Sequence, residues 1–156
     1  MKTRKTWREK METAREPKIV TIPTKMQKRM GTGTMLIPGS ALDVDALIRK
    51  VPRGKLATQT QLREKLARDA GADTACPVLT GIFVRIVAEA AEESSREGKL
   101  RITPYWRIVR DDGRLLEKLP GGPTAQSEKL AGEGHKIDRS GKLRVEDLSA
   151  SLSRLI

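Results

Sequence analysis

The chain has 156 residues, with 31 Lys and Arg against 20 Asp and Glu, which gives a formal net charge of +11. No apolar run reaches the ~20 residues that a membrane-spanning helix needs. One cysteine and one histidine make neither an internal disulfide nor the usual zinc cage. These counts exclude a membrane-spanning protein, a disulfide-stabilised secreted scaffold and a zinc finger. We expect a soluble, cytoplasmic, nucleoid-associated protein of about one domain that binds a polyanion and needs no cofactor.

Positive charge is concentrated near the start of the chain, where residues 1–35 are predicted to form a basic N-terminal arm. Residues 1–30 hold ten Lys or Arg and three Glu, a net charge of +7. Trp7, Met11 and Ala14 stand at helical spacing, which predicts a short amphipathic helix over 5–15. Pro17 and Pro23 then frame an extended segment. A nucleic-acid-binding tail, a solvated leader and a segment packed on the domain all fit this composition.

Two capped helices are predicted after the arm. Ser40 with Asp43 begins the first, which ends in the turn at 52–54. Its apolar face is predicted to consist of Leu42, Val44, Ala46, Leu47 and Val51. Thr58 and Gln61 form a second capping box, and the helix that they begin ends near Gly71. The buried stripe of that helix is predicted to be Leu62, Leu66 and Ala67.

A third helix is predicted over residues 79–96, closed by Gly98. The residues expected to face inward are Ile82, Phe83, Ile86, Val87 and Ala90. The opposite face offers Thr80, Gly81 and Arg85, the small and basic residues with which a helix enters a DNA groove. Cys76, in the loop before this helix, is expected to be a buried structural residue.

The second half of the chain carries strand and turn signals. Residues 101–103 and 106–109 are strand-like, and residues 111–113 are a hairpin turn leading into 114–116. A loop at 120–123 precedes a helix at about 124–131. Ile137 is expected to pair with residues 143–145 before a short C-terminal helix. The predicted fold class is therefore mainly α with a small β-hairpin, in the plan of a winged helix-turn-helix.

Three stretches, in this order, resemble the DNA-binding domain of the O6-alkylguanine-DNA alkyltransferases. They are residues 51–62 (VPRGKLATQTQL), residues 102–109 (ITPYWRIV), and a set formed by residues 112–113, the glycine pair 121–122 and residues 130–135 (LAGEGH). The resemblance covers roughly residues 42–137. It implies a winged-helix DNA-binding domain over 36–137, with residues 138–156 as a C-terminal extension of a hairpin and a short helix.

The resemblance also implies that this chain is not an enzyme. In that family a cysteine thiolate accepts the alkyl group after a histidine, held by a glutamate, removes its proton. Tyr105 stands at the position of the cysteine and Trp106 at that of the histidine, whereas Pro104, Arg107 and Glu133 match. A phenol with a pKa of about 10 and no neighbouring base is a poor acceptor at neutral pH. The chain thus most resembles the non-catalytic alkyltransferase-like proteins, which bind DNA and mark alkylated bases for repair.

Matching positions define two sets of candidate residues. The DNA-contacting set is Thr58, Gln59, Thr60, Thr80, Gly81, Arg85 and Arg107. The base-pocket set is Tyr105, Trp106, Leu119, Pro120, Gly121 and Gly122. Adjacent strand residues point to opposite faces, so one aromatic ring is expected to line the pocket and the other to pack inward. The rings either stack an extruded base or fill the pocket and exclude it.

The expected partners are double-stranded DNA, alkylated or not, and a repair protein, with neither a membrane nor a metal. Two other functions fit the same features. The first is a winged-helix regulator that binds duplex DNA without flipping a base. The second is a protein-interaction module in which the base pocket is closed and the basic arm binds an acidic partner.

Overall fold

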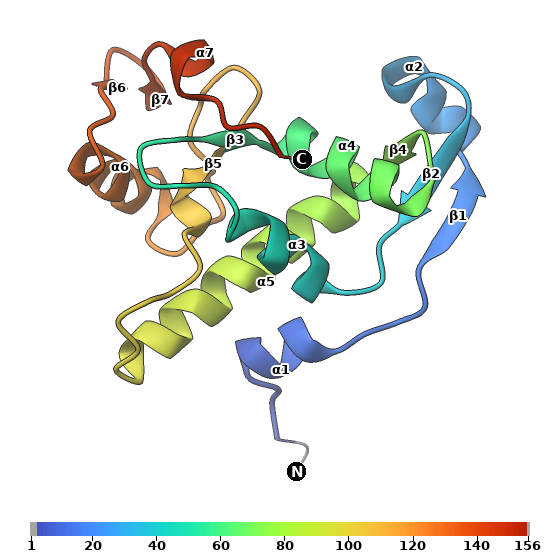
Figure 1. Cartoon of the computed structure of the whole chain (residues 1–156), viewed down its shortest axis with the longest axis horizontal. Helices are drawn as coiled ribbons and strands as arrows, with labels where there is room; N and C mark the ends of the chain where they lie inside the picture. Colours follow the sequence, from blue (N-terminus) through green and yellow to red (C-terminus); the bar gives the residue numbers. More distant parts are fainter. Residues whose placement is uncertain (1–2, 156) are drawn as a thin grey trace.

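The longest helix, α5 (Pro77–Arg96), crosses the middle of the computed structural model, which describes residues 3–155 (Figure 1). Its buried side chains are small or β-branched, and they let α1 (Trp7–Glu12), α3 (Ala41–Ile48) and α4 (Gln59–Ala70) pack against it. Burial follows the stripe through Val84, Val87, Ala88 and Ala91. The expectation that Ile82 faces inward is therefore wrong, since this residue lies off the stripe and is 48% exposed.

The two helices before α5 begin and end close to the predicted positions. Thr58 and Gln61 make both hydrogen bonds of the predicted capping box of α4, which ends at Gly71 in the left-handed conformation. In α3 the Ser40 side chain accepts from the backbone N–H of Leu42, and the reciprocal bond from Asp43 is not formed. Leu42 and Ala46 are exposed, contrary to expectation. The residues of this segment that pack inward are Val44, Leu47, Ile48 and Val51.

The N-terminal arm is folded onto the rest of the molecule. Helix α1 lies within the range predicted for it, and β1 (Lys18–Thr21) pairs antiparallel with β2 (Thr34–Ile37). Strand β2 pairs in parallel with β4 (Thr74–Ala75), and the short helices η1 (Thr24–Met26) and α2 (Gln27–Met30) connect the first two strands. Ile22, Met35 and Cys76 form a small core beside this sheet, which confirms that Cys76 is buried. The boundary expected after residue 35 falls within β2, so the division into domains stays a prediction.

The segment after α5 differs most from expectation. Residues 101–104 form no strand, and residues 105–107 form a 3-10 turn, η2 (Tyr105–Arg107), before the two-residue strand β5 (Ile108–Val109). Strand β5 pairs in parallel with β3 (Ala57–Thr58) rather than with residues 114–116. Gln126, on α6 (Gly122–Gly132), fixes this arrangement. Its buried amide accepts from Leu116 N–H at 2.8 Å and donates to the carbonyls of Trp106 and Ile108 at 3.0 and 2.8 Å.

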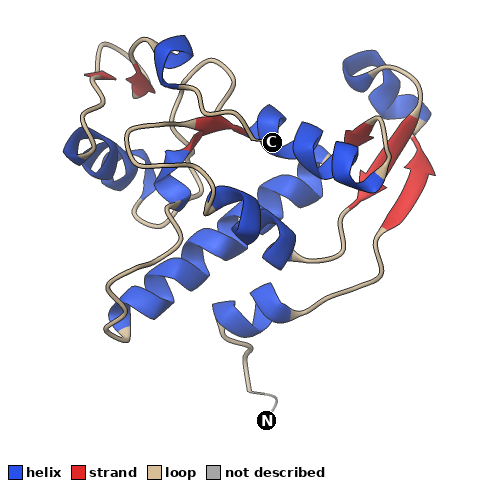
Figure 2. Ribbon diagram, viewed as in Figure 1, coloured by secondary structure: helices blue, strands red, loops and turns tan. Residues whose placement is uncertain are grey.

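The C-terminal segment forms the predicted hairpin and helix. Strand β6 (Ile137–Asp138) pairs antiparallel with β7 (Arg144–Val145), and α7 (Leu148–Ser151) follows. The end of the chain then returns to the start of β3, where Ser153 N–H donates to the Leu56 carbonyl at 2.7 Å. Figure 2 shows the result, a mainly helical fold with short strands, as the sequence predicts.

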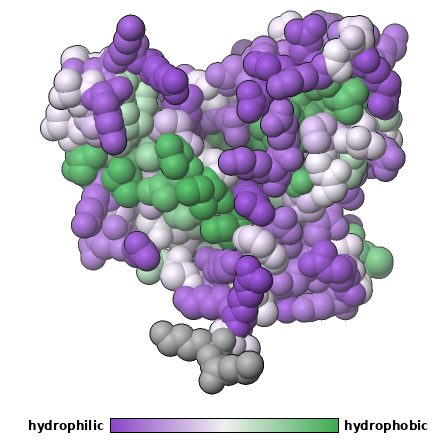
Figure 3. Space-filling model, turned by 180° about the vertical axis from the view of Figure 1, so that it is seen from behind, coloured by the Kyte–Doolittle hydropathy of each residue, from purple (hydrophilic) through white to green (hydrophobic). Residues whose placement is uncertain are grey.

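The surface is mostly hydrophilic, with apolar residues gathered on part of it. Seen from behind, apolar side chains form a region left of centre and another at the upper right, with hydrophilic side chains around them (Figure 3). Among the large apolar residues with high exposure, Val78 (63%) and Ile82 (48%) both belong to α5. Within residues 3–155, no helix is long and apolar enough to cross a membrane.

Candidate nucleic-acid interface

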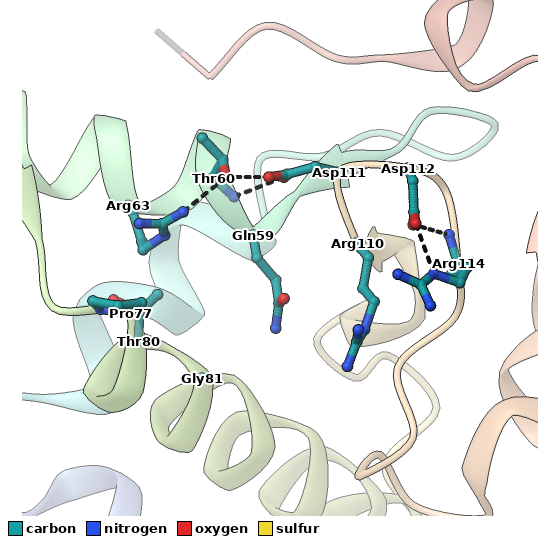
Figure 4. Close-up of a pocket in the computed structure, with 10 residues that line it drawn as sticks. All are labelled: Gln59, Thr60, Arg63, Pro77, Thr80, Gly81, Arg110, Asp111, Asp112 and Arg114. Atoms are coloured by element: carbon teal, nitrogen blue, oxygen red, sulfur yellow. Dashed lines mark hydrogen bonds and ion pairs between the residues drawn. The ribbon is translucent and has the colours of Figure 1, made fainter. Parts of the chain in front are cut away.

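Two adjoining hollows lie between the first half of α5, the start of α4 and residues 110–119. The inner hollow, about 330 Å³, includes Thr60, Arg63 and Arg114 in its wall (Figure 4). The outer hollow, about 630 Å³, is lined mainly by α5, by residues 116–119 and by α1. Gln59, Gly81 and Arg110 line both, so we treat the two hollows as one groove, called the α5 groove. Figure 4 shows the side chains of Gln59 and Arg110 pointing into it toward α5.

The α5 groove is basic because six Lys and Arg side chains line it against three carboxylates, those of Asp111, Asp112 and Glu117. Asp111 accepts from the Thr60 hydroxyl at 2.6 Å, and Asp112 pairs with the Arg114 guanidinium at 2.6 Å. The hydrogen bond from the backbone N–H of Arg114 to Asp112, with the guanidinium beside it, lowers the pKa of that carboxyl. Among the described residues, no carboxylate pairs with Arg85, Arg110 or Lys118, three more cations of the groove.

One exposed face of α5 forms the floor of the groove. Val78, Gly81, Ile82 and Arg85 stand at helical spacing on it, and all four line the outer hollow. A Cβ atom added at Gly81 would meet no heavy atom within 4 Å, so the backbone is open to solvent there. This face combines small, apolar and basic side chains, as a helix that enters a DNA groove requires.

The structure brings four of the seven predicted DNA-contacting residues to the groove surface and makes the other three internal. Gln59, Thr60, Gly81 and Arg85 line it. Thr58 is buried as the cap of α4. Thr80 reaches the inner hollow but is 1% exposed, with its hydroxyl donating to the Cys76 carbonyl at 2.8 Å.

Arg107 makes internal contacts on the far side of η2. Its guanidinium donates to both carboxylate oxygens of Glu133, at 2.9 and 2.7 Å, and to the Val51 carbonyl at 2.7 Å. Burial alone would raise the pKa of Glu133, but the hydrogen bonds and charge of Arg107 outweigh it, so the pKa is lowered. Burial lowers the pKa of His135, which lies near the same pair. Arg107 thus ties η2 to the end of α6 through Glu133 and to the turn after α3 through Val51.

The predicted base pocket is filled by the aromatic side chains that were expected to line it. Tyr105 is 2% exposed, and its hydroxyl donates to Glu92 at 2.5 Å. Burial and then the Glu92 carboxylate raise the pKa of this phenol. Because η2 is a 3-10 turn, the rings of Tyr105 and Trp106 do not point to opposite faces as a strand would place them. They meet edge to face, with centroids 5.3 Å apart.

The other base-pocket residues lie around this packed centre. Leu119 is 5% exposed, packs in the same core cluster as Tyr105, and reaches the outer hollow of the α5 groove. Pro120 precedes the turn formed by Gly121 and Gly122, whose positive φ angles (+76° and +68°) lead the chain into α6. A Cβ atom at Gly121 would come within 2.5 Å of the Ala125 Cβ, so the glycine there is required by the fold.

Sequence reasoning missed Arg63, Arg110, Arg114 and Lys118, together with Trp7 and Lys10 of the arm, all of which line the groove. The turn signal at 111–113 was a usable indication for Arg110 and Arg114, because residues next to a tight turn lie on the surface. No signal in the sequence brings Trp7 to α5. Within the described part of the chain, no group of three or more His, Cys, Asp or Glu side chains is arranged to hold a metal ion.

No family model and no curated protein sequence matches the chain. Among solved structures it is similar to S. pombe Atl1 in complex with damaged DNA containing O6-carboxymethylguanine, with 17% identity and a TM-score of 0.51. It is also similar to S. pombe ATL in complex with DNA, with 18% identity and a TM-score of 0.53. Both matches cover 73% of this chain and 94% of the other. The chain therefore has the alkyltransferase-like fold that its sequence predicts.

Proposed function

We propose that this protein binds duplex DNA through the α5 groove without catalysis, and that it recognises damaged bases for DNA repair in the cytoplasm. The observation that carries the proposal is the set of unpaired cations, Arg85, Arg110 and Lys118, around the exposed face of α5. Both similar structures are complexes with DNA, which supports the same partner here.

The groove suits a duplex because charge and shape act on different parts of the ligand. The cations on its rim are positioned to neutralise phosphates, which supplies affinity without regard to sequence. Val78 and Ile82 present exposed apolar side chains between them, and proteins that bind the minor groove use such side chains as wedges between base steps. Wedging unstacks the duplex locally, and a damaged or mispaired base needs the least energy to leave the stack.

Alkyl transfer is not part of the proposed function. The phenol of Tyr105 is buried, bonded to Glu92, and has a raised pKa, so it stays protonated at neutral pH. A protonated phenol without a neighbouring base is a poor nucleophile. Cys76, the one cysteine, is buried in the core beside Ile22 and Met35 and lines neither hollow of the α5 groove.

The first test is a change of Arg110, which lines both hollows. We expect Arg110→Gln to weaken binding to matched duplex by about 1–2 kcal/mol and to reduce the slope of log affinity against log salt by about 0.9, the value of one phosphate contact. Fluorescence anisotropy at two salt concentrations measures both quantities. The matched control is Arg101→Gln, an exposed arginine after the far end of α5.

Each outcome separates the proposal from its alternative. Equal losses for Arg110→Gln and Arg101→Gln would mean that DNA is bound by net charge and not by this groove. No binding by the unaltered protein at either salt concentration would favour the interaction module, in which the base pocket is closed, as the burial of Tyr105 closes it here.

A further inference from the structure

The outer hollow of the α5 groove has the composition of a small-ligand pocket rather than of a flat DNA-contacting surface. Its volume of about 630 Å³ falls within the ~300–1,000 Å³ typical of such pockets. Apolar walls are supplied by Val78, Ile82, Leu116 and Leu119. Four cations also line the hollow, against one carboxylate, Glu117, which pairs with Lys142 at 3.3 Å. The hollow therefore fits a flat apolar ring attached to negatively charged groups.

The aromatic side chain of this hollow comes from the N-terminal arm, outside the part of the chain that resembles the alkyltransferases. Trp7 lies at the start of α1 and lines the hollow together with Lys10. The Lys10 ammonium lies 4.2 Å from the centre of the indole ring, and the Arg85 guanidinium carbon lies 5.8 Å from it. Trp7 thus holds one cation from the arm and one from α5 beside the hollow.

Helix α1 is fixed in this position by acidic residues of α5. The Glu93 carboxylate accepts from the backbone N–H groups of Trp7 and Arg8, at 3.1 and 3.3 Å, and Arg8 also pairs with Glu97 at 2.7 Å. Partial burial would raise the pKa of Glu93, but these hydrogen bonds and the Arg8 charge lower it. Arg15 N–H donates to the Gly39 carbonyl at 2.8 Å, which fastens the chain after α1.

We propose that the outer hollow is a nucleotide site that takes one unpaired or alkylated base extruded from duplex DNA, with Trp7 as its aromatic wall. This proposal rests on the proposed DNA-binding function and gives the arm a defined part in it. Lys10, Arg85, Arg110 and Lys118 contact the phosphates on either side of the extruded nucleotide. Aromatic side chains beside a positively charged path are the usual way in which proteins hold unstacked bases.

The site lies outward of the pocket that the sequence resemblance indicates. Tyr105 fills the pocket that the resemblance indicates. Leu119 packs in the same core cluster as Tyr105 and also lines the outer hollow, so it separates the two. The walls of the outer hollow are largely apolar, with Gln59 as its uncharged polar side chain. It therefore selects a base by size and apolar surface rather than by the hydrogen bonds of the base edge, and it favours an alkylated base over an ordinary one.

The test compares a matched duplex with the same duplex carrying O6-methylguanine, using the full chain. We expect Trp7→Ala to lower affinity for the methylated duplex about fivefold or more and to change affinity for the matched duplex less than about twofold. We expect Trp7→Phe to keep most of the preference for the methylated duplex. Leu100→Ala removes a side chain that is 99% exposed beyond the end of α5 and is the matched control. Thermal melting shows whether each variant is folded.

Three binding outcomes decide between the claims. Loss of the preference in Trp7→Ala alone supports the site. Equal affinity of the unaltered protein for both duplexes, or a preference that survives Trp7→Ala, would overturn it while leaving DNA binding in place. Absence of all binding would overturn the proposed function as well.

A crosslinking experiment on the unaltered protein covers the case in which Trp7→Ala does not fold. A duplex with one unpaired 5-iododeoxyuridine is irradiated with the protein and digested with trypsin. Crosslinks to the peptide of residues 6–8, which contains Trp7, support the site. Crosslinks to residues 102–107, which contain Tyr105 and Trp106, would place the base in the pocket that the sequence resemblance indicates and would overturn the proposed site.

Discussion

Tyr105 occupies the position that the sequence resemblance marks for chemistry, and its surroundings make it part of the core. The ring is buried against Trp106 and Leu119, and its hydroxyl is bonded to Glu92, which also lies 3.7 Å from the Lys129 ammonium. Of the two interpretations that the sequence leaves open, these contacts support the one in which the aromatic pair fills the pocket.

The titration of Tyr105 tests its burial, because it is the one tyrosine of the chain. Its pKa in the folded protein is raised by burial and by Glu92, whereas in the unfolded chain it should be about 10. The stability that the neutral phenol contributes is fully present below pH ~10 and is lost as the pH rises further, because the unfolded state ionises first.

In urea, spectrophotometric titration should therefore detect tyrosinate near pH ~10. In buffer, tyrosinate should appear only at the higher pH at which circular dichroism shows that the protein unfolds. Tyr105→Phe removes this contribution to the pH dependence. A folded protein whose tyrosine ionises at its ordinary pKa would show that the ring is open to solvent.

At the scale of the elements, the start of helix α4 forms part of the groove wall, and its position depends on the capping of the first turn. Thr58 and Gln61 cap each other's backbone N–H groups, and the Gln61 amide also donates to the Ser153 carbonyl at 2.9 Å. The capping box thus fixes both the start of α4, where Gln59 and Thr60 face the groove, and the end of the chain.

Removal of this cap should weaken the fold rather than a DNA contact. We expect Thr58→Ala to lower the free energy of unfolding by about 0.5–2 kcal/mol, the usual value of a lost N-cap, and to leave DNA affinity unchanged at temperatures where the protein is fully folded. Urea denaturation and anisotropy measure the two effects, with Thr32→Ala, an exposed threonine outside any helix, as control. A loss of affinity without a loss of stability would return Thr58 to the DNA-contacting set.

The elements that the sequence predicts well are those whose signals are local. The capping box at Thr58, the glycine end at Gly71 and the hairpin at 137–145 need only neighbouring residues. The strand predicted over 106–109 forms only at 108–109, because the conformation of this segment is set from a distance. Gln126 binds the carbonyls of Trp106 and Ile108 from α6, and the apolar residues of that segment pack as a 3-10 turn.

In the candidate site, too, residues placed by local signals could be predicted and residues placed by distant contacts could not. Gly81 and Arg85 can be placed from helical spacing alone, because the exposed face of α5 is a local property. Arg107 cannot, since Glu133, the residue that binds it, lies 26 positions later in the chain. Trp7 reaches the groove only because Glu93 binds the start of α1 across 86 positions. Composition identifies the arm as basic but contains no information about where it docks.

At the scale of the whole molecule, three cations of the arm lie in or next to the α5 groove. A third hollow, about 610 Å³, adjoins the outer one through Lys10 and is lined also by Arg15 and Lys18. Deleting residues 1–29 is therefore not a clean test of the arm, because β1 and the buried Ile22 would be lost with it. Neutralising charges on the intact fold is the sharper experiment.

We expect the triple change Lys10→Gln, Arg15→Gln and Lys18→Gln to lower affinity for duplex DNA at low salt and to bring the affinity close to that of the unaltered protein at high salt. Counterion release gives the reason, because each lost phosphate contact reduces the slope of log affinity against log salt by about 0.9. The control changes Lys99, Arg101 and Arg139 to Gln, three exposed residues outside the three hollows, and so matches the net charge. Anisotropy over a salt series gives both slopes. If the two triple variants share one slope, the arm acts on DNA through total charge alone, and the path from the α5 groove to Lys18 is not part of the interface.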